Sequence, residues 1–161
     1  VIQFLKWFTM LDEGAIAEIQ SRHEAAPHER HAQQALAHAM TTLIHGTGAA
    51  ERAESAAQAL FTGEVAALDE STLEDVFADV ASSEHARGDL EGEGVGLVDL
   101  LPATSLAQSK REAREFLTGG AISINGRKVG LDDRLATNDL LHGRLILIRR
   151  GKKKWHATKW R

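Results

Sequence analysis

Along the first 85 residues, apolar side chains recur every three or four positions, which is the spacing of one helix face. Leu36, Met40 and Leu43 are typical of the pattern. It predicts helices over residues 2–10, from about Asp12, from Pro27 to His45, over residues 49–61, and from the capping-box sequence Ser71-Thr72-Leu73-Glu74. We therefore expect residues 1–85 to form an all-helical domain.

A glycine-rich stretch, ARGDLEGEGVG, follows at residues 86–96. Its four glycines and mixed charge favour neither a helix nor a strand. We interpret this stretch as a linker between two domains.

Residues 97–161 mix helix and strand patterns. A short helix is expected at 97–101, and a second capping box at Ser109 opens a helix that ends at Gly119-Gly120. Residues 121–124 alternate like a strand, Asn125-Gly126 is typical of a tight hairpin turn, and residues 127–129 return. Further strands are predicted over residues 143–150 and 153–160. The expected fold class is therefore α+β: an all-helical domain, then a small α/β domain (97–161) with a helix pair, a hairpin and short antiparallel strands.

The net charge of −4 conceals opposite charges in the two parts of the chain. Residues 1–103 carry 5 Lys and Arg against 18 Asp and Glu, a net of −13, whereas residues 104–161 carry 14 against 5, a net of +9. A short basic module on an otherwise acidic chain indicates a polyanionic partner for that module.

The basic residues form three clusters, on the helix after Ser109, on the hairpin and near the C-terminal end. At 100° per residue, the helix cations share one side, next to the buried stripe. We expect a groove between this helix and the hairpin to bind a sugar-phosphate backbone. Trp155 and Trp160 either stack on bases or belong to the core. The candidate RNA-binding residues are Lys110, Arg111, Arg114, Asn125, Arg127, Lys128, Arg149, Arg150, Lys152, Lys153, Lys154, His156 and Lys159.

The helix and hairpin resemble the S-four RNA-binding module. The residues that carry this resemblance are Ser109, Ala113-Arg114, Leu117, Gly120, Ile122, Ile124-Asn125-Gly126 and Val129. The segments FLKWFT (residues 4–9) and AQQALAHAMTTLIHG (residues 32–46) resemble the anticodon-binding helical domain of bacterial tyrosyl-tRNA synthetases. The order of the segments is also similar, so nearly the whole chain resembles the C-terminal region of that family.

The resemblance implies a tRNA-binding portion of a tyrosine–tRNA ligase that positions tyrosine tRNA for aminoacylation, through the anticodon stem and the variable arm. It implies a parent enzyme that uses ATP and Mg and dimerises through its catalytic domain. Neither the HIGH-like nor the KMSKS-like motif of that domain occurs in this sequence. We therefore expect this chain alone to be a monomer without catalysis or cofactor. Its start at Val1, without methionine, also suggests a piece of a longer protein.

Two other function classes are open to such a sequence. A stand-alone, ribosome-associated factor for structured RNA would use the same basic module, although it would not need the helical first half. A metal-dependent hydrolase is suggested by eight histidines, of which His31, His38 and His45 recur every seven residues. Residues seven apart rise roughly 10 Å along a helix, too far to share one zinc ion, so we expect no metal site.

Cysteine is absent, which excludes disulfides, thiol catalysis and cysteine zinc sites. A reducing, cytoplasmic location is compatible with that composition. Because no stretch of eighteen uncharged apolar residues occurs, we expect no transmembrane helix.

Overall fold

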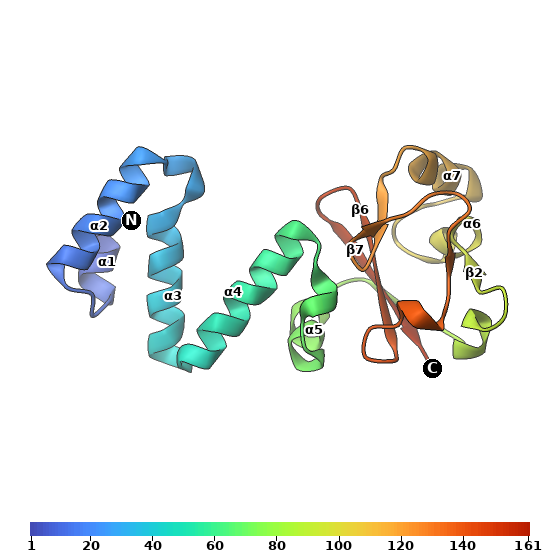
Figure 1. The fold of residues 1–161 in the computed structure, drawn as a ribbon, viewed down its shortest axis with the longest axis horizontal. Coiled ribbons are helices and arrows are strands. Elements are labelled where there is room, and N and C mark those ends of the chain that lie inside the picture. Colours follow the sequence, from blue (N-terminus) through green and yellow to red (C-terminus); the bar gives the residue numbers. More distant parts are fainter. The chain divides into compact units, whose positions relative to one another are not determined.

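The computed structural model describes all 161 residues, which divide into two compact units, residues 1–55 and 56–161 (Figure 1). The helices are α1 (Ile2–Phe8), α2 (Glu13–Ala25), α3 (His31–His45), α4 (Thr47–Thr62), α5 (Glu70–Phe77), α6 (Leu97–Leu100) and α7 (Lys110–Thr118). The strands are β1 (Ser82–His85), β2 (Val95–Gly96), β3 (Ile122–Ile124), β4 (Arg127–Lys128), β5 (Arg134–Leu135), β6 (Leu145–Arg150) and β7 (Lys154–Trp160). Helices come first and an α/β part follows, so the expected fold class is confirmed. None of the helices has the length and apolar character that crossing a bilayer requires.

In the first unit, α1, α2 and α3 pack around a small core of Leu5, Ile16 and Ala32. The helices were predicted, but Pro27 does not open α3. It begins a single 3-10 turn, Pro27–Glu29, because Arg30 then adopts a left-handed backbone with φ 59°. The long helix therefore starts at His31, four residues after the predicted start.

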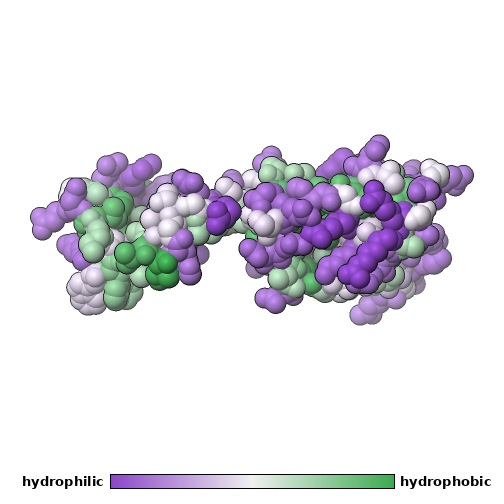
Figure 2. Space-filling view, turned by 90° about the horizontal axis from the view of Figure 1, so that it is seen from below, coloured by the Kyte–Doolittle hydropathy of each residue, from purple (hydrophilic) through white to green (hydrophobic).

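The first unit also exposes large apolar side chains. Trp7 is 63% exposed and Met10 94%, and green, hydrophobic surface gathers on this unit in Figure 2. The exposed set on α1, the turn after it and the end of α3 is Phe4, Trp7, Phe8, Met10, Leu11, Leu43 and Ile44. The apolar crowding in residues 2–11 therefore reflects a helix with two apolar faces, of which this unit buries one.

The second unit contains a five-stranded sheet in the order β1-β7-β6-β3-β4. Strands β3, β4, β6 and β7 are antiparallel, as predicted, with Ile148 opposite His156. Strand β1 was not predicted, because its sequence SSEH has no apolar alternation, and it pairs in parallel with β7. A separate pair joins β2 to β5.

Helices cover both faces of this sheet, giving three layers (Figure 1). On one face, Ile146 and Trp160 pack with Leu97 of α6 and Leu117 of α7. On the other face, the core is made by Leu73, Phe77, Leu147 and Ala157, together with the end of α4. Because successive side chains of a strand point to opposite faces, β6 and β7 contribute to both cores.

The division between the units differs from the expected boundary at residues 86–96. Helix α5 and the end of α4 belong with the sheet, and the structure divides between Ser55 and Ala56. The glycine-rich stretch is also packed on the second unit: Leu90 is 1% exposed, and Arg134 donates to the carbonyl of Glu93 at 2.6 Å. The apolar stripe of α5 predicts a buried face, but its spacing does not identify the partner.

Candidate nucleic-acid interface

Helix α7 begins at Ser109, as the sequence predicts, although Glu112 accepts from Gln108 and not from Ser109 as in a complete capping box. The Ser109 hydroxyl accepts the Glu112 amide at 3.2 Å, and the Glu112 carboxylate accepts the Gln108 amide at 2.6 Å. Ala113 and Leu117 are buried beneath the helix. This packing fixes which side of α7 faces solvent, and therefore where its cations point.

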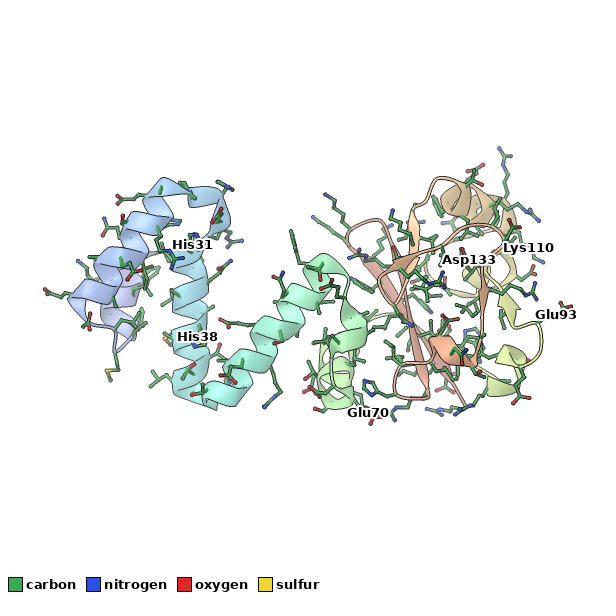
Figure 3. All side chains as sticks on the ribbon, in the orientation of Figure 1. His31, His38, Glu70, Glu93, Lys110 and Asp133 are labelled. Atoms are coloured by element: carbon green, nitrogen blue, oxygen red, sulfur yellow. The ribbon has the colours of Figure 1, made fainter.

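One flank of α7 carries a cationic cluster around Asp99. The Lys110 ammonium lies 2.6 Å from the Asp99 carboxylate. The hydrogen bond between them is the main reason why the pKa of Asp99 is lowered. The charges of Arg114 and Arg134 lower the same pKa further. Figure 3 shows Lys110 at this edge of the second unit. Lys110, Arg114 and Arg134 form what we call the helix cluster.

The other flank of α7 faces the loop between β6 and β7. Glu112 and Phe116 form one wall of a groove of about 570 Å³, and Ala121 and the segment Arg150–Lys154, the lysine hairpin, form the rest. Arg150 lies 4.5 Å over the Phe116 ring and 3.6 Å from Glu112. This groove therefore has an aromatic wall and a cationic edge.

A second hollow of about 370 Å³ lies beside the same hairpin. Its lining includes Ser105 and Trp155, together with Lys153 and Lys154, which also border the groove. Lys152, Lys153 and Lys154 are exposed, and none forms an ion pair with a carboxylate of its own unit. The lysine hairpin thus presents three free ammonium groups between two concave surfaces.

The β3–β4 hairpin has the expected turn, with φ 48° at Asn125 and 93° at Gly126. Its tip, however, is used internally. The Asn125 amide donates to the carbonyl of Asp139 at 2.6 Å and accepts from the Leu147 amide at 3.0 Å. Gly126 packs directly on the backbone of Gly63. Asn125 therefore holds the turn in place and does not present its amide to solvent as expected.

Two other candidates also have structural roles. His156 is 3% exposed, so it lies in the core and cannot reach a ligand on the surface. The Arg149 guanidinium lies 5.0 Å from the Trp155 ring and donates to the Leu60 carbonyl. Trp160 is 2% exposed, which decides in favour of its core role.

Three further candidates, all cations, lie outside the lysine hairpin. Arg111 points outward from α7 and pairs with Glu115 at 3.2 Å, and Arg127 pairs with Asp133 (Figure 3 labels Asp133). Lys128 is exposed and donates to the Gly120 carbonyl. The exposed candidates that make no ion pair with a carboxylate of their own unit are Arg114, Lys128, Lys152, Lys153, Lys154 and Lys159.

The expected single groove between helix and hairpin is therefore corrected. The cations occupy two clusters on different flanks of α7, because Lys110 and Arg114 are about half a turn away from Glu112 and Phe116. The prediction also missed Arg134. No pattern around that residue marks it, since only the fold of the β2–β5 pair brings it to Asp99.

The histidines of the first unit form no metal centre. His31 lies 2.7 Å from the Glu29 carboxylate and His38 lies 2.8 Å from that of Glu54, both on α3 (Figure 3). No group of three or more His, Asp or Glu side chains is arranged to hold a metal ion.

Comparison with known proteins gives consistent relatives. The chain is 41% identical over 161 residues to tyrosine–tRNA ligase 1 of Bacillus cereus, covering 99% of this chain and 37% of that protein. It is 42% identical over 156 residues to tyrosine–tRNA ligase of a Mycobacterium species, covering 95% of this chain and 36% of that protein. The chain thus spans little more than a third of the length of these relatives.

A solved structure described as the solution structure of a tyrosyl-tRNA synthetase C-terminal domain is 37% identical, with a TM-score of 0.48. That match covers 63% of this chain and 98% of the other. A family model, the tyrosine–tRNA ligase SYY-like C-terminal domain, matches residues 72–158. Those residues include most of α5, all of the sheet except the end of β7, and the lysine hairpin, and they are more than half of the chain. The chain therefore belongs to the tyrosine–tRNA ligase SYY-like C-terminal domain family.

Proposed function

We propose that this chain is the tRNA-binding portion of a tyrosine–tRNA ligase, and that it positions tyrosine tRNA for aminoacylation by a catalytic domain outside these residues. Its relatives of greater length carry the name of that enzyme. The parent protein would be an ATP-dependent ligase of the cytoplasm that takes ATP and Mg in its catalytic domain.

The observation that carries the proposal is the lysine hairpin. Three adjacent ammonium groups, Lys152, Lys153 and Lys154, have no carboxylate partner in their unit and lie between two hollows. Lysine charges that no protein carboxylate neutralises are available to displace the counterions of a nucleic acid. This release of counterions is the main source of affinity between a basic protein surface and a nucleic acid. The aromatic walls at Phe116 and Trp155 leave room beside these charges for ribose or base contacts.

The helix cluster offers a second contact for the same RNA. Arg114 is exposed and makes no ion pair, whereas Lys110 pairs with Asp99. Two cationic clusters on different flanks of one helix suit two separate segments of a folded RNA better than a single strand. The anticodon stem and the variable arm of tyrosine tRNA are the two segments that we assign to them.

Binding to tyrosine tRNA with and without its variable arm tests this assignment. We expect the intact tRNA to bind more tightly, and the lysine-hairpin triple variant K152A/K153A/K154A to lose affinity. A tRNA lacking the arm should also lose affinity to the native chain. Equal affinities for the two tRNAs would refute a role of the variable arm, and an unaffected triple variant would refute the hairpin as the contact surface.

The fragment is proposed to lack chemistry of its own. It should form no tyrosyl-adenylate, so ATP–pyrophosphate exchange should stay at background in the presence of tyrosine. It should also sediment as a monomer, since we assign dimerisation of the parent to the missing catalytic domain. Measurable exchange, or a dimer in sedimentation, would contradict these two statements respectively.

A further inference from the structure

A continuous chain of hydrogen bonds runs through the second unit beneath the lysine hairpin. The Ser105 amide and hydroxyl lie 3.2 and 3.0 Å from Nδ1 of His156. Nε2 of the same ring lies 3.0 Å from the Ser83 hydroxyl, which in turn lies 2.7 Å from Nε2 of His85. Three separate segments are joined in this way: the loop before α7, strand β7 and strand β1.

The backbone amide of Ser105 fixes the protonation state of this chain. An amide N–H can only donate, so Nδ1 of His156 must accept and the ring proton must be on Nε2. Nε2–H then donates to Ser83, whose hydroxyl donates to His85. A hydroxyl can rotate to suit a new proton, but the Ser105 amide cannot. A second proton on His156 would therefore place two donors face to face.

The same loop contacts the lysine hairpin directly. Ser105 lines the second hollow together with Lys153 and Lys154. The next residue, Leu106, accepts a hydrogen bond from the Arg150 guanidinium through its carbonyl. Arg150 is the first residue of the hairpin, and His156 lies two residues after its last residue, Lys154. The Ser105 loop therefore contacts the chain at both ends of the hairpin.

We propose that His156 is a positioning residue for the lysine hairpin, and that proton uptake by its ring releases the Ser105 loop and weakens RNA binding as the pH falls. This proposal rests on the proposed function, because the surface that it regulates is the one proposed to bind tRNA. The proton enters at Nδ1, at the expense of the Ser105 amide contact, and no other bond changes.

The charges around His156 oppose proton uptake until the pH is low. Burial lowers the pKa of His156, and the nearby His85 lowers it further. Lys153 and Lys154 beside Ser105, and Arg150 beside Leu106, are also cationic. The surrounding carboxylates are Asp89, which raises the pKa of His85, and Glu112, which pairs with Arg150. His156 is thus neutral at neutral pH and holds the loop.

The sign of the pH effect separates this device from general electrostatics. Protonation of exposed histidines adds positive charge and should strengthen RNA binding at low pH. Release of the loop predicts the reverse. The native chain should bind more weakly at pH 5.5 than at pH 7.5, whereas a chain whose residue 156 cannot titrate should not.

The decisive experiment measures the Kd for tyrosine tRNA from pH 5.0 to 8.0 at constant ionic strength, for the native chain and His156→Gln. Below the pKa of His156, the native Kd should rise by up to about tenfold per pH unit. The glutamine amide can accept from Ser105 and donate to Ser83 but does not titrate, so its Kd should stay level or fall. His45→Gln, an exposed histidine of the first unit, is the matched control and should follow the native curve.

A second readout does not need a variant or RNA. Amide hydrogen exchange of Ser105 in the native chain should accelerate below pH 6 relative to that of β6, after correction for intrinsic exchange, because the Ser105 amide loses its acceptor. Identical pH curves for native chain and His156→Gln, with binding intact at pH 7.5, would overturn this inference alone. Absence of binding at pH 7.5 would overturn the proposed function and the binding half of the inference, while unchanged exchange of the Ser105 amide would overturn the structural half.

Discussion

The Cα of Gly126 lies against the carbonyl oxygen of Gly63, so close that a β-carbon on Gly126 would come within 2.1 Å of that oxygen. Both glycines have positive φ, 93° in each case. The contact joins the β3–β4 turn to the loop after α4, two segments that lie far apart in the sequence of the second unit. It explains why the turn is structural: its tip is covered by backbone.

Gly126→Ala should destabilise the second unit by roughly 2–4 kcal/mol, because the methyl group both meets the Gly63 carbonyl and strains a left-handed backbone. Urea denaturation would measure the loss. Gly151→Ala is the matched control, since Gly151 has φ 62° with no atom within 4 Å of the added carbon, and it should cost only about 1 kcal/mol. Equal losses in the two variants would mean that the contact with Gly63 contributes nothing.

Helix α5 is capped by Asp69 and not by Ser71, where the sequence pattern suggested a capping box. The Asp69 carboxylate accepts the Thr72 amide at 2.9 Å and hydroxyl hydrogen bonds from Ser71 and Thr72, all of which hold its pKa below its ordinary value. Asp69→Ala should therefore lower the Tm, and Ser71→Ala much less. Thermal unfolding of both variants at pH 7 would measure the two Tm values. A larger drop in Tm for Ser71→Ala would favour the cap that the sequence pattern suggested.

The buried His156 and the half-buried His85 should make the second unit less stable in mild acid. Burial lowers the pKa of His85 and of His156 from 6.5, so the unfolded chain takes up protons before the folded one does. Their contribution is complete above pH 6.5 and is lost as the pH falls from there toward the lowered folded pKa values. The Tm should drop between pH 7.5 and pH 5.5, and the drop should shrink in His156→Gln. A drop of the same size in that variant would assign the effect to other groups.

Binding of the isolated chain to tyrosine tRNA should depend strongly on salt. With about five phosphate contacts, a plot of log K against log salt should have a slope of roughly −3.5 to −4.5. Replacement of Lys152, Lys153 and Lys154 by alanine should reduce its magnitude by about 2 to 3. The control K6A/R22A/R52A removes the same charge from exposed positions of the first unit and should leave the slope nearly unchanged. A flat salt response would refute an electrostatic interface.

Arg114→Ala should weaken tRNA binding without unfolding the chain, because Arg114 is exposed and makes no ion pair. Arg111→Ala is the comparison, since Arg111 lies on the same helix but pairs with Glu115 and is 90% exposed. Filter binding and far-UV circular dichroism on both variants separate contact from folding. Unchanged affinity in Arg114→Ala would remove the helix cluster from the interface.

Local sequence signals predicted the elements that depend on neighbours along the chain. The Ser109 N-cap, the Asn125-Gly126 turn and the antiparallel strands β3, β6 and β7 all formed where expected. Strand β1 was missed because its residues are polar and show no alternation of apolar and polar positions. Its backbone pairing with β7 stabilises it, and that pairing leaves no mark in the sequence. The same limit applies to Arg134, which reaches Asp99 only through the β2–β5 pair.

The sequence by itself determined the class of fold, the charge asymmetry and the family to which the basic module belongs. Capping, turn chemistry and charge are properties of short segments and can be read without the fold. The tertiary structure alone decided which basic residues are free. Lys152, Lys153 and Lys154 remain unpaired, whereas His156 and Asn125 are used inside the unit. It also placed the division of the chain before Ala56, since the burial of an apolar helix face is settled by the surface that covers it.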